Sequence, residues 1–291
     1  MTTVWIFPGQ GSQSVGMGQE LVSVVAVTDQ LQQARQILGW DPLGLDADQI
    51  SRTLYTQPAL FVVSALLSDL VQAQGFEPTA VAGHSLGEYV ALYRAGVFDF
   101  ETGLTLVQQR ALLMDGIQGG TMAAIIGFDR QALSDLCAST EGVSIANDNS
   151  PDQVVITGSE AGVAAVTEQI KAKRIVPLAV SGAFHSPFMA EPAEKFNALL
   201  APILFHPARI PVYSNVSALP SQDPDVLKAN LCQQMTGSVR WRETVQQMAD
   251  DGISTVWEIG PGSVLTGLVK RTIKELERVN IASPDQIPTL G

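Results

Sequence analysis

A serine between two glycines, in the stretch VAGHSLGEY at residues 81–89, is the feature of the sequence best suited to chemistry. The small apolar residues before it predict a β-strand, and residues 86–94 predict the start of a helix. A side chain on such a tight turn is exposed at the end of the sheet, and the flanking glycines prevent collisions in the turn. The helix also directs free backbone N–H groups toward the serine. We therefore predict that Ser85 is the nucleophile of a G-x-S-x-G elbow, with an ordinary turn serine as the alternative.

A serine hydroxyl needs a base to remove its proton, and the sequence offers three histidines. His84 adjoins Ser85, so we expect its side chain on the opposite face of the strand, in a scaffold role. His206 precedes a proline in a loop-like setting, where we expect it near the surface. His185 lies among small residues in SGAFHSPFM and is predicted to be the base. No acidic residue stands in an obvious place to complete a triad, but a backbone carbonyl can hold the Nδ1 proton instead.

The elements that must position these residues alternate between apolar, β-rich runs and helical patterns, which predicts an α/β fold. The first strand is expected at residues 3–7 and a long helix at about 17–38. Another helix is predicted to begin at Gln57-Pro58, because proline is favoured at the first helical position. The last strand is expected at residues 254–260, followed by a terminal helix.

The pattern of apolar and helical stretches changes at residues 121–186, where it is consistent with the order β-α-β-β-α-β. That order predicts a ferredoxin-like small subdomain. It would be inserted into a larger catalytic subdomain formed by residues 1–120 and 187–291. An active site containing Ser85 and His185 would then draw on both sides of the insertion.

Composition and charge limit the possible partners of the chain. Its 291 residues are 46% hydrophobic and 16% charged, which is typical of a compact globular protein. The net charge of −12 argues against nucleic acid or an anionic membrane as a partner. Apolar runs fall short of a membrane span and no cleavable leader is recognised, so a cytoplasmic location is expected. No metal cluster and no lysine-containing phosphate loop is found.

Five separated motifs resemble, in order and spacing, those of malonyl-CoA:acyl carrier protein transacylases: FPGQGSQ, GHSLGEY, QQRALLM, GAFHSPFM and EIGPGSVLTGLVKR. The resemblance covers essentially the whole chain. It implies an α/β-hydrolase-like large subdomain carrying an inserted ferredoxin-like small subdomain. It also implies an acyltransferase without a bound cofactor. Such an enzyme moves the malonyl group of malonyl-CoA to the phosphopantetheine thiol of acyl carrier protein through a malonyl-Ser85 ester, supplying extender units for fatty acid synthesis.

The same resemblance implies roles for individual residues. Ser85 would carry the malonyl group and His185 would act as general acid and base. The backbone N–H groups of Gln10 and Leu86 would form the oxyanion hole. The backbone carbonyl of Gln234 would orient His185, which is how the family functions without an acidic third member.

Two further positions concern the acyl group. The resemblance implies that Arg110 holds the free carboxylate of malonate, and a guanidinium suits this task because it forms two charge-assisted bonds to a carboxylate. The alternative is a surface arginine. Phe184 would crowd an α-methyl group and so favour malonyl over methylmalonyl, with an ordinary core phenylalanine as the alternative. Residues 145–149 match a family segment that lines the site.

Acyl carrier protein is acidic, so docking it to this acidic chain requires a local basic patch. The candidates are residues 171–174, Arg240 with Arg242, and Lys270 with Arg271. Two other functions remain open at this point: a serine hydrolase or thioesterase, and a non-catalytic binding module. A convincing acid before His185 would favour the first, and loss of Ser85 or His185 would favour the second. The sequence leaves the choice between fatty acid and polyketide synthesis open, although a chain of this length favours the former.

Overall fold

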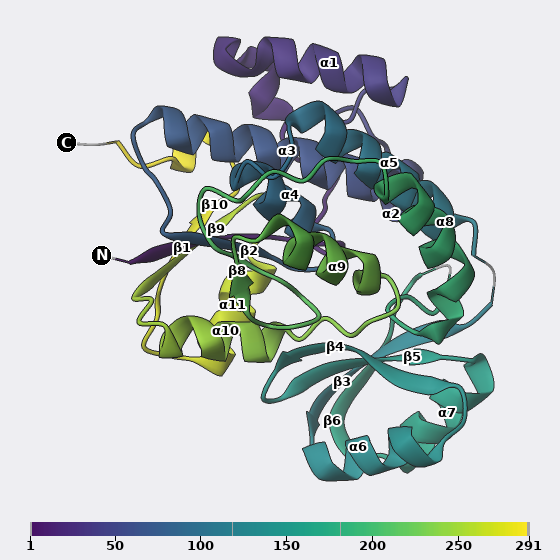
Figure 1. Ribbon diagram of the computed structural model, residues 1–291. Helices are drawn as coiled ribbons and strands as arrows, with labels where there is room; N and C mark the ends of the chain where they lie inside the picture. The colour runs from purple at the N-terminus through teal and green to yellow at the C-terminus, as the bar shows by residue number, and fades with distance from the viewer. Residues whose placement is uncertain (1, 118, 181, 290–291) are drawn as a thin grey trace.

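Two β-sheets, each with its own helices, organise the protein in this computed structural model, which describes residues 2–117, 119–180 and 182–289 (Figure 1). The larger sheet has the strand order β10-β9-β1-β2-β7-β8. Its strands are β1 (Thr3–Phe7), β2 (Ala80–Gly83), β7 (Val212–Tyr213), β8 (Pro220–Ser221), β9 (Thr255–Ile259) and β10 (Glu277–Ile281). All neighbouring pairs are parallel except β7 with β8. The parallel strands therefore present their carboxyl ends at one edge, where β2 leads into the predicted elbow.

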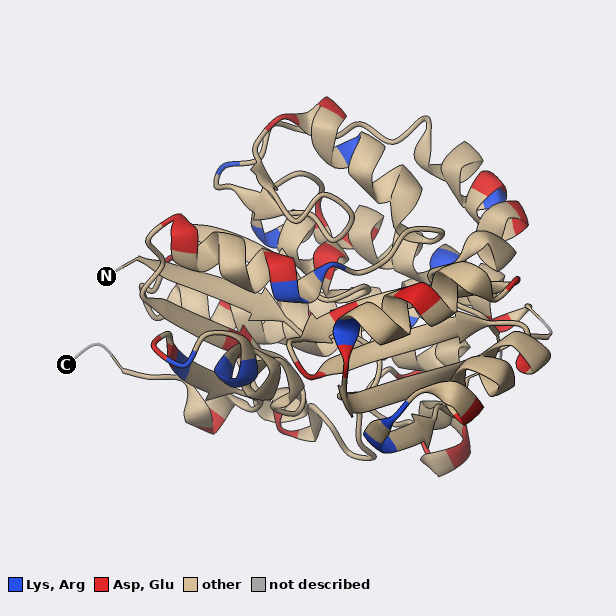
Figure 2. Cartoon of the chain, turned by 90° about the horizontal axis from the view of Figure 1, so that it is seen from below, with Lys and Arg blue, Asp and Glu red and all other residues tan. Residues whose placement is uncertain are grey.

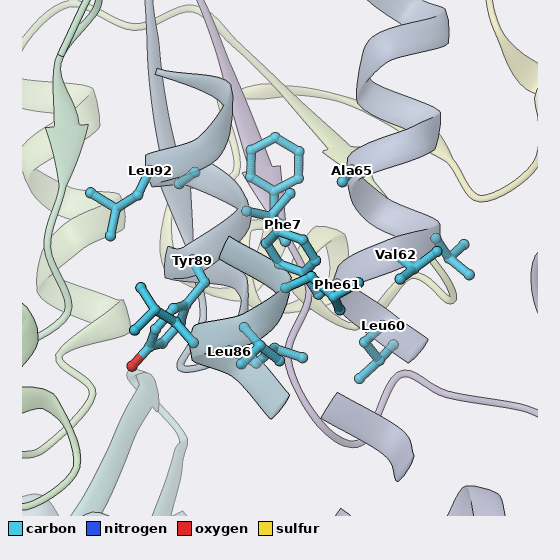
Figure 3. Packing of buried hydrophobic residues seen from close by; sticks show 14 of the residues in the cluster. Phe7, Leu60, Phe61, Val62, Ala65, Leu86, Tyr89 and Leu92 are labelled. Atoms are coloured by element: carbon cyan, nitrogen blue, oxygen red, sulfur yellow. The ribbon is translucent and has the colours of Figure 1, made fainter. Parts of the chain in front are cut away.

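Helices cover both faces of the larger sheet, which is why its central strands are apolar throughout. Successive residues of β1 point to opposite sides, so Trp5 and Phe7 belong to one buried core while Val4 and Ile6 belong to another. The first face carries α3 (Thr53–Ala73), α4 (Gly87–Arg94) and α5 (Phe100–Asp115), and the second carries α10 (Trp241–Asp250) and α11 (Val264–Thr272). Figure 3 shows Leu86 and Tyr89, at the start of α4, in the first of these cores.

The smaller sheet is the predicted ferredoxin-like unit. Its strands are β3 (Thr121–Phe128), β4 (Val143–Ser150), β5 (Gln153–Gly158) and β6 (Ala172–Pro177), in the antiparallel order β4-β5-β3-β6. Helices α6 (Arg130–Ser139) and α7 (Glu160–Gln169) cover one face (Figure 1). The predicted β-α-β-β-α-β order is confirmed. The subdomain boundaries after residues 120 and 186 stay a prediction.

The two sheets are joined through β4. Asn147 forms an isolated parallel bridge with Val239, which lies just before α10. Asp148 then accepts hydrogen bonds from Arg130 of α6 and from Arg242 of α10, so its carboxylate is clamped from both sides. These contacts hold β4 against the larger subdomain.

The helix predicted at residues 17–38 is wrong over its first half. The structure has the short 3-10 turns η1 (Gln19–Ser23) and η2 (Val25–Val27), and the α-helix α1 covers only Thr28–Leu38. Gly18 has a φ of +73°, and an added Cβ would lie 2.7 Å from a methyl group of Val63. The left-handed glycine and the valine-rich run that follows both disfavour helix.

The predicted start of α3 is also wrong, because the helix begins at Thr53 and Pro58 lies inside it. Proline removes one intrahelical hydrogen bond there. The preceding turn is held in another way: the Thr56 hydroxyl donates to the backbone carbonyls of Ile50 at 2.6 Å and Arg52 at 2.9 Å. Ile50 lies in α2 (Ala47–Ser51), which leads directly into this helix.

By length and composition, α3 is long and apolar enough to cross a membrane, contrary to the expectation from the sequence. Its most apolar window has a mean hydropathy of 1.4, but 78% of that window is buried inside the protein. Figure 3 shows Leu60, Phe61, Val62 and Ala65 of α3 in the core beside α4. In this structure α3 is a core helix.

The last third of the chain completes the larger subdomain with η3 (Pro187–Met189), α8 (Ala190–Leu200) and α9 (Pro224–Gln234). The strand β9 was expected to be the last, but β10 follows α11 and pairs in parallel with β9. The sequence of β10, ERVNI, begins with two charged residues, and charged side chains are common in an edge strand. A short turn, η4 (Pro284–Gln286), comes after it.

Candidate active site

The turn between β2 and α4, which contains the predicted nucleophile, has the predicted geometry. Ser85 has a φ of 49°, a left-handed conformation that few non-glycine residues adopt. A Cβ on Gly83 would lie 1.9 Å from the backbone of Gly87. A Cβ on Gly87 would lie 2.0 Å from the carbonyl oxygen of Phe7. Both glycines are therefore required by close backbone packing, as the pattern predicts.

His185 reaches this turn across a sequence separation of 100 residues. The Ser85 hydroxyl lies 2.8 Å from His185 Nε2, within hydrogen-bond distance. On the other side of the ring, Nδ1 lies 2.9 Å from the carbonyl oxygen of Gln234 and 3.2 Å from that of Gly237. Because a carbonyl only accepts, Nδ1 must carry the proton and Nε2 is left with a lone pair for Ser85. Of the sequence-predicted residues, Ser85, His185 and Gln234 are therefore brought together.

The electrostatic surroundings keep the His185 ring neutral. Burial lowers its pKa to about 3, and the nearby positive charge of Arg110 acts in the same direction. The two backbone carbonyls favour the charged form but do not compensate for burial. A neutral imidazole at neutral pH is the form that can accept the Ser85 proton.

Catalysis by His185 is expected to persist on the acid side of pH 6.5, where an ordinary histidine would be half protonated. The folded-state pKa of about 3 keeps the ring unprotonated through that range. The unfolded chain binds this proton below about pH 6.5, so the shift also makes the fold less stable as the pH falls. A pH profile of kcat/KM for acyl transfer measures the first effect. An inflection near the ordinary histidine pKa would contradict it.

Arg110 is fully buried on α5 rather than at the surface. Its Nη1 donates to Gln57 Oε1 at 2.7 Å, and its Nη2 donates to Ser85 Oγ at 3.0 Å and to Gln234 Oε1 at 3.1 Å. The guanidinium also lies 5.5 Å from the centre of the Tyr89 ring. Within the described ranges, no carboxylate lies within 4.0 Å of it. A buried cation held only by neutral groups is suited to bind a carboxylate that comes with a substrate.

The residues predicted to provide the oxyanion donors line the same cavity as Ser85. Leu86 follows Ser85 at the beginning of α4, and Gln10 lies in the loop after β1. Among hydrogen bonds between described residues, neither backbone N–H acts as a donor. The Gln10 loop approaches closely, because a Cβ on Gly9 would lie 2.4 Å from the His84 carbonyl oxygen. These two N–H groups are therefore free to donate to a negative oxygen near Ser85.

An inner cavity of about 90 Å³ is lined by the predicted site residues Gln10, Ser85, Leu86, Phe184 and His185, together with Met114 and others. An outer channel of about 300 Å³ adjoins it and shares Gln10, His84 and Asn147 with it. The channel runs between the Gln10 loop, α11 and the smaller sheet, so a long ligand arm could reach Ser85 along it. In the described part of the chain, no group of three or more His, Cys, Asp or Glu side chains could hold a metal.

The other two histidines were expected to have non-catalytic roles. His206 is exposed, as expected. His84 was expected on the opposite face of the strand in a scaffold role, and the residue is also among those that line the inner cavity. Its Nε2 lies 2.8 Å from Asn149 Oδ1, and its ring packs edge-on against Trp241. A scaffold role fits these contacts.

Three polar residues around the site were not found from the sequence: Gln57, Glu88 and Asn215. The Asn215 side chain accepts from the Ser85 backbone N–H at 2.6 Å and donates to the Gly83 carbonyl at 2.6 Å. It therefore braces both sides of the nucleophile turn. Its position just after β7, the strand beside β2, is the signal that could have identified it.

Comparison with known proteins agrees with this site. The chain belongs to the acyl transferase domain family, which matches residues 4–290. It is 51% identical to the malonyl CoA-acyl carrier protein transacylase of Synechocystis sp., with 100% of each chain covered. The crystal structure of the Synechocystis malonyl-CoA:ACP transacylase superposes with a TM-score of 0.97 over 99% of both chains.

Two more relatives extend the comparison. A polyketide biosynthesis malonyl CoA-acyl carrier protein transacylase of Bacillus velezensis is 41% identical over 94% of this chain and 97% of that protein. A malonyl-transacylase in complex with its type II PKS acyl-carrier protein has a TM-score of 0.93 at 36% identity, covering 99% of this chain and 98% of that one. The resemblance predicted from the five motifs is confirmed. Membership of an acyltransferase family favours acyl transfer over the hydrolase and binding-module alternatives.

Proposed function

We propose that this protein transfers the malonyl group from malonyl-CoA to the phosphopantetheine thiol of acyl carrier protein, through an ester on Ser85. The observation that carries the proposal is the position of a buried, carboxylate-free Arg110 at 3.0 Å from the same hydroxyl that lies 2.8 Å from His185 Nε2. A nucleophile with a base explains acyl transfer, and the adjacent cation explains why the acyl group carries a carboxylate.

The first half-reaction forms the ester. His185 Nε2 accepts the Ser85 proton while Oγ attacks the thioester carbonyl. The carbonyl oxygen becomes negative and accepts hydrogen bonds from the N–H groups of Gln10 and Leu86. Collapse of this intermediate breaks the carbon–sulfur bond, and the CoA thiolate takes the proton from His185. In the second half-reaction the phosphopantetheine thiol attacks the ester, its proton passes to His185 and then to Ser85 Oγ, and the product leaves.

Arg110 links substrate binding to this proton transfer. In the free protein its charge opposes protonation of His185. A malonyl carboxylate bound to the guanidinium would cancel much of that charge, and protonation of His185 would then be less costly. A substrate with a carboxylate therefore makes it easiest for His185 to accept the Ser85 proton. Phe184, which lines the inner cavity, would restrict the space beside the α-carbon of the acyl group.

A transfer assay with purified acyl carrier protein tests the function. Malonyl-, methylmalonyl- and acetyl-CoA are supplied separately, and the acylated carrier is separated from free carrier. We expect transfer from malonyl-CoA to exceed that from the other two donors. Equal use of acetyl-CoA would contradict the role of Arg110, and release of free malonate without carrier acylation would indicate a hydrolase. Carriers of fatty acid and polyketide systems can be compared in the same assay, and we propose the fatty acid carrier as the acceptor.

The three basic candidates for carrier docking differ in their ion pairs and in their positions. Arg240 is bound to Glu243, and Arg242 is bound to Asp148, so both charges are already paired. Residues 172–174 lie on β6, at the edge of the smaller sheet opposite β4, and Lys171 directly precedes this strand. In Figure 2 the basic residues form small groups among more numerous acidic ones.

Lys270 and Arg271 lie beside the outer channel and are exposed. Arg271 Nη2 donates to Gln153 Oε1 at 3.1 Å, and Gln153 lines the channel. Arg271 Nε also lies 3.9 Å from Asp152 Oδ1, but this ion pair is longer and more exposed than those of Arg240 and Arg242. We propose that an acidic carrier docks here, with its phosphopantetheine arm directed into the channel. A cytoplasmic location is also proposed, supported by the burial of α3 in the core.

Reversing the charge of Lys270 and Arg271 is expected to weaken the binding of acyl carrier protein specifically. The double substitution Lys270→Glu with Arg271→Glu should raise KM for acyl carrier protein about three- to tenfold, because charges at an interface rim mainly affect association. KM for malonyl-CoA is measured in parallel, together with the salt dependence of both. The matched control is Lys171→Glu with Lys173→Glu, which makes the same charge change away from the channel. An equal rise in the control would contradict docking at residues 270–271.

A further inference from the structure

Glu88, the second residue of α4, is a buried carboxylate that the reaction scheme above does not use. Only 1% of the residue is exposed. Burial raises the pKa of its carboxyl to about 7, even though neighbouring donors and the charge of Arg110 favour the ionised form. A buried carboxyl group without a direct basic partner is costly, and an apolar residue would be cheaper for stability alone. Its contacts therefore suggest a task other than packing.

Glu88 Oε2 accepts from the backbone N–H of Asn215 at 3.3 Å, but its shortest contact is with Gln234. Glu88 Oε2 accepts from Gln234 Nε2 at 2.6 Å, and the same Nε2 donates to the Ser85 carbonyl at 2.9 Å. At the other end of the amide, Oε1 accepts from Arg110 Nη2 at 3.1 Å. The backbone carbonyl of Gln234 faces His185 Nδ1 at 2.9 Å. One fully buried glutamine thus touches the nucleophile turn, the base and the cation.

The amide of Gln234 can take only one orientation between these partners. The backbone carbonyl of Ser85 only accepts hydrogen bonds, and the guanidinium of Arg110 only donates them. The nitrogen end must therefore face Ser85, where Glu88 Oε2 provides a second acceptor, and the oxygen end is left for Arg110. If Glu88 did not accept from Nε2, only the Ser85 carbonyl would hold that end. The Gln234 side chain could then turn its nitrogen toward Arg110. Two hydrogen-bond donors, Gln234 Nε2 and Arg110 Nη2, would then face each other without an acceptor.

We infer that Glu88 is a positioning residue for malonyl selectivity, because it fixes the amide of Gln234 and thereby the direction in which Arg110 presents its guanidinium to the substrate carboxylate. This inference rests on the proposed function. The inferred role depends on whether a carboxyl oxygen of Glu88 reaches Gln234 Nε2, and not on the charge of Glu88. The competing explanation is that an acidic residue in the first turn of α4 stabilises the helix through its dipole, and that effect depends on charge.

Two substitutions separate these explanations. Glu88→Gln keeps the length and an acceptor oxygen but loses the charge, whereas Glu88→Asp keeps the charge but retracts the acceptor by one methylene. Positioning predicts that the ratio of kcat/KM for malonyl-CoA over acetyl-CoA falls about tenfold or more in Glu88→Asp and changes less than about threefold in Glu88→Gln. A dipole role predicts a stability loss in Glu88→Gln and an unchanged ratio in both variants.

A matched control addresses general destabilisation. Asp69 pairs with Arg94 at the other end of α4, at 2.7 Å and away from the inner cavity. Asp69→Asn should lower Tm while the malonyl-to-acetyl ratio stays at the wild-type value. A ratio that is unchanged in Glu88→Asp, or that falls as much in Asp69→Asn, overturns the inference. If wild-type protein shows no malonyl transfer, the proposed function fails instead, which is a separate outcome.

Discussion

Replacement of His185 with alanine is expected to lower kcat for malonyl transfer on the order of 10³- to 10⁴-fold. The reason is that Ser85 Oγ, 2.8 Å from His185 Nε2, would lose the acceptor for its proton. Arg110 also lies near that hydroxyl, but a guanidinium is always protonated and cannot act as the base. Initial rates at saturating malonyl-CoA and acyl carrier protein provide the measurement.

The matched control for this prediction is His206→Ala. It removes another imidazole from the same chain, at an exposed position outside the inner cavity. We expect it to keep wild-type rates. A His185→Ala protein that is folded by circular dichroism and retains more than about a tenth of wild-type kcat would contradict the role of His185.

Replacement of Arg110 with alanine is expected to exchange the order of substrate preference. The kcat/KM for malonyl-CoA should fall on the order of 100-fold or more, because loss of one member of a desolvated charge pair costs about 2–5 kcal/mol. Acetyl-CoA brings no carboxylate to the cavity, so its use should fall much less. Steady-state rates with both donors and the same carrier measure the effect.

Arg110→Lys tests the geometry as well as the charge. Lysine cannot reproduce the two donors that reach Gln57 and Gln234 at once, so we expect it to recover only a small part of malonyl transfer. Thermal denaturation should show both variants to be folded, since Arg110 is a buried cation without a carboxylate partner in the described chain. Equal losses with malonyl-CoA and acetyl-CoA would show that Arg110 serves the fold rather than the substrate.

The parts of the site that could be predicted from the sequence are those with strong local constraints. At Gly83 and Gly87 neighbouring backbone atoms lie so close that no Cβ fits, and this constraint is visible in the sequence as the G-x-S-x-G pattern. The smaller subdomain was also predictable, because its strands and helices alternate regularly and turn residues separate them. In both cases a short stretch of sequence contains most of the physical reason for the structure.

The supporting contacts could not be predicted because they depend on tertiary packing. Gln234 meets Glu88 across 146 residues, and Asn215 meets Ser85 across 130. Apart from the position of Asn215 just after a strand, nothing local distinguishes these amides and this carboxylate from surface residues. The incorrect start of α3 has a similar origin, because burial and the Thr56 hydroxyl bonds maintain helix around Pro58. Local preference favoured a helix start at that proline, and tertiary contacts extended the helix.

The central claim is that the Ser85 hydroxyl becomes esterified with the help of His185. Intact-protein mass spectrometry after mixing with malonyl-CoA tests it most directly, with peptide mapping to locate the modification. We predict a mass increase of one malonyl group on Ser85, which disappears when acyl carrier protein is added and does not form in Ser85→Ala. Malonylated carrier produced without any adduct on Ser85, or an adduct on another residue, would contradict the account.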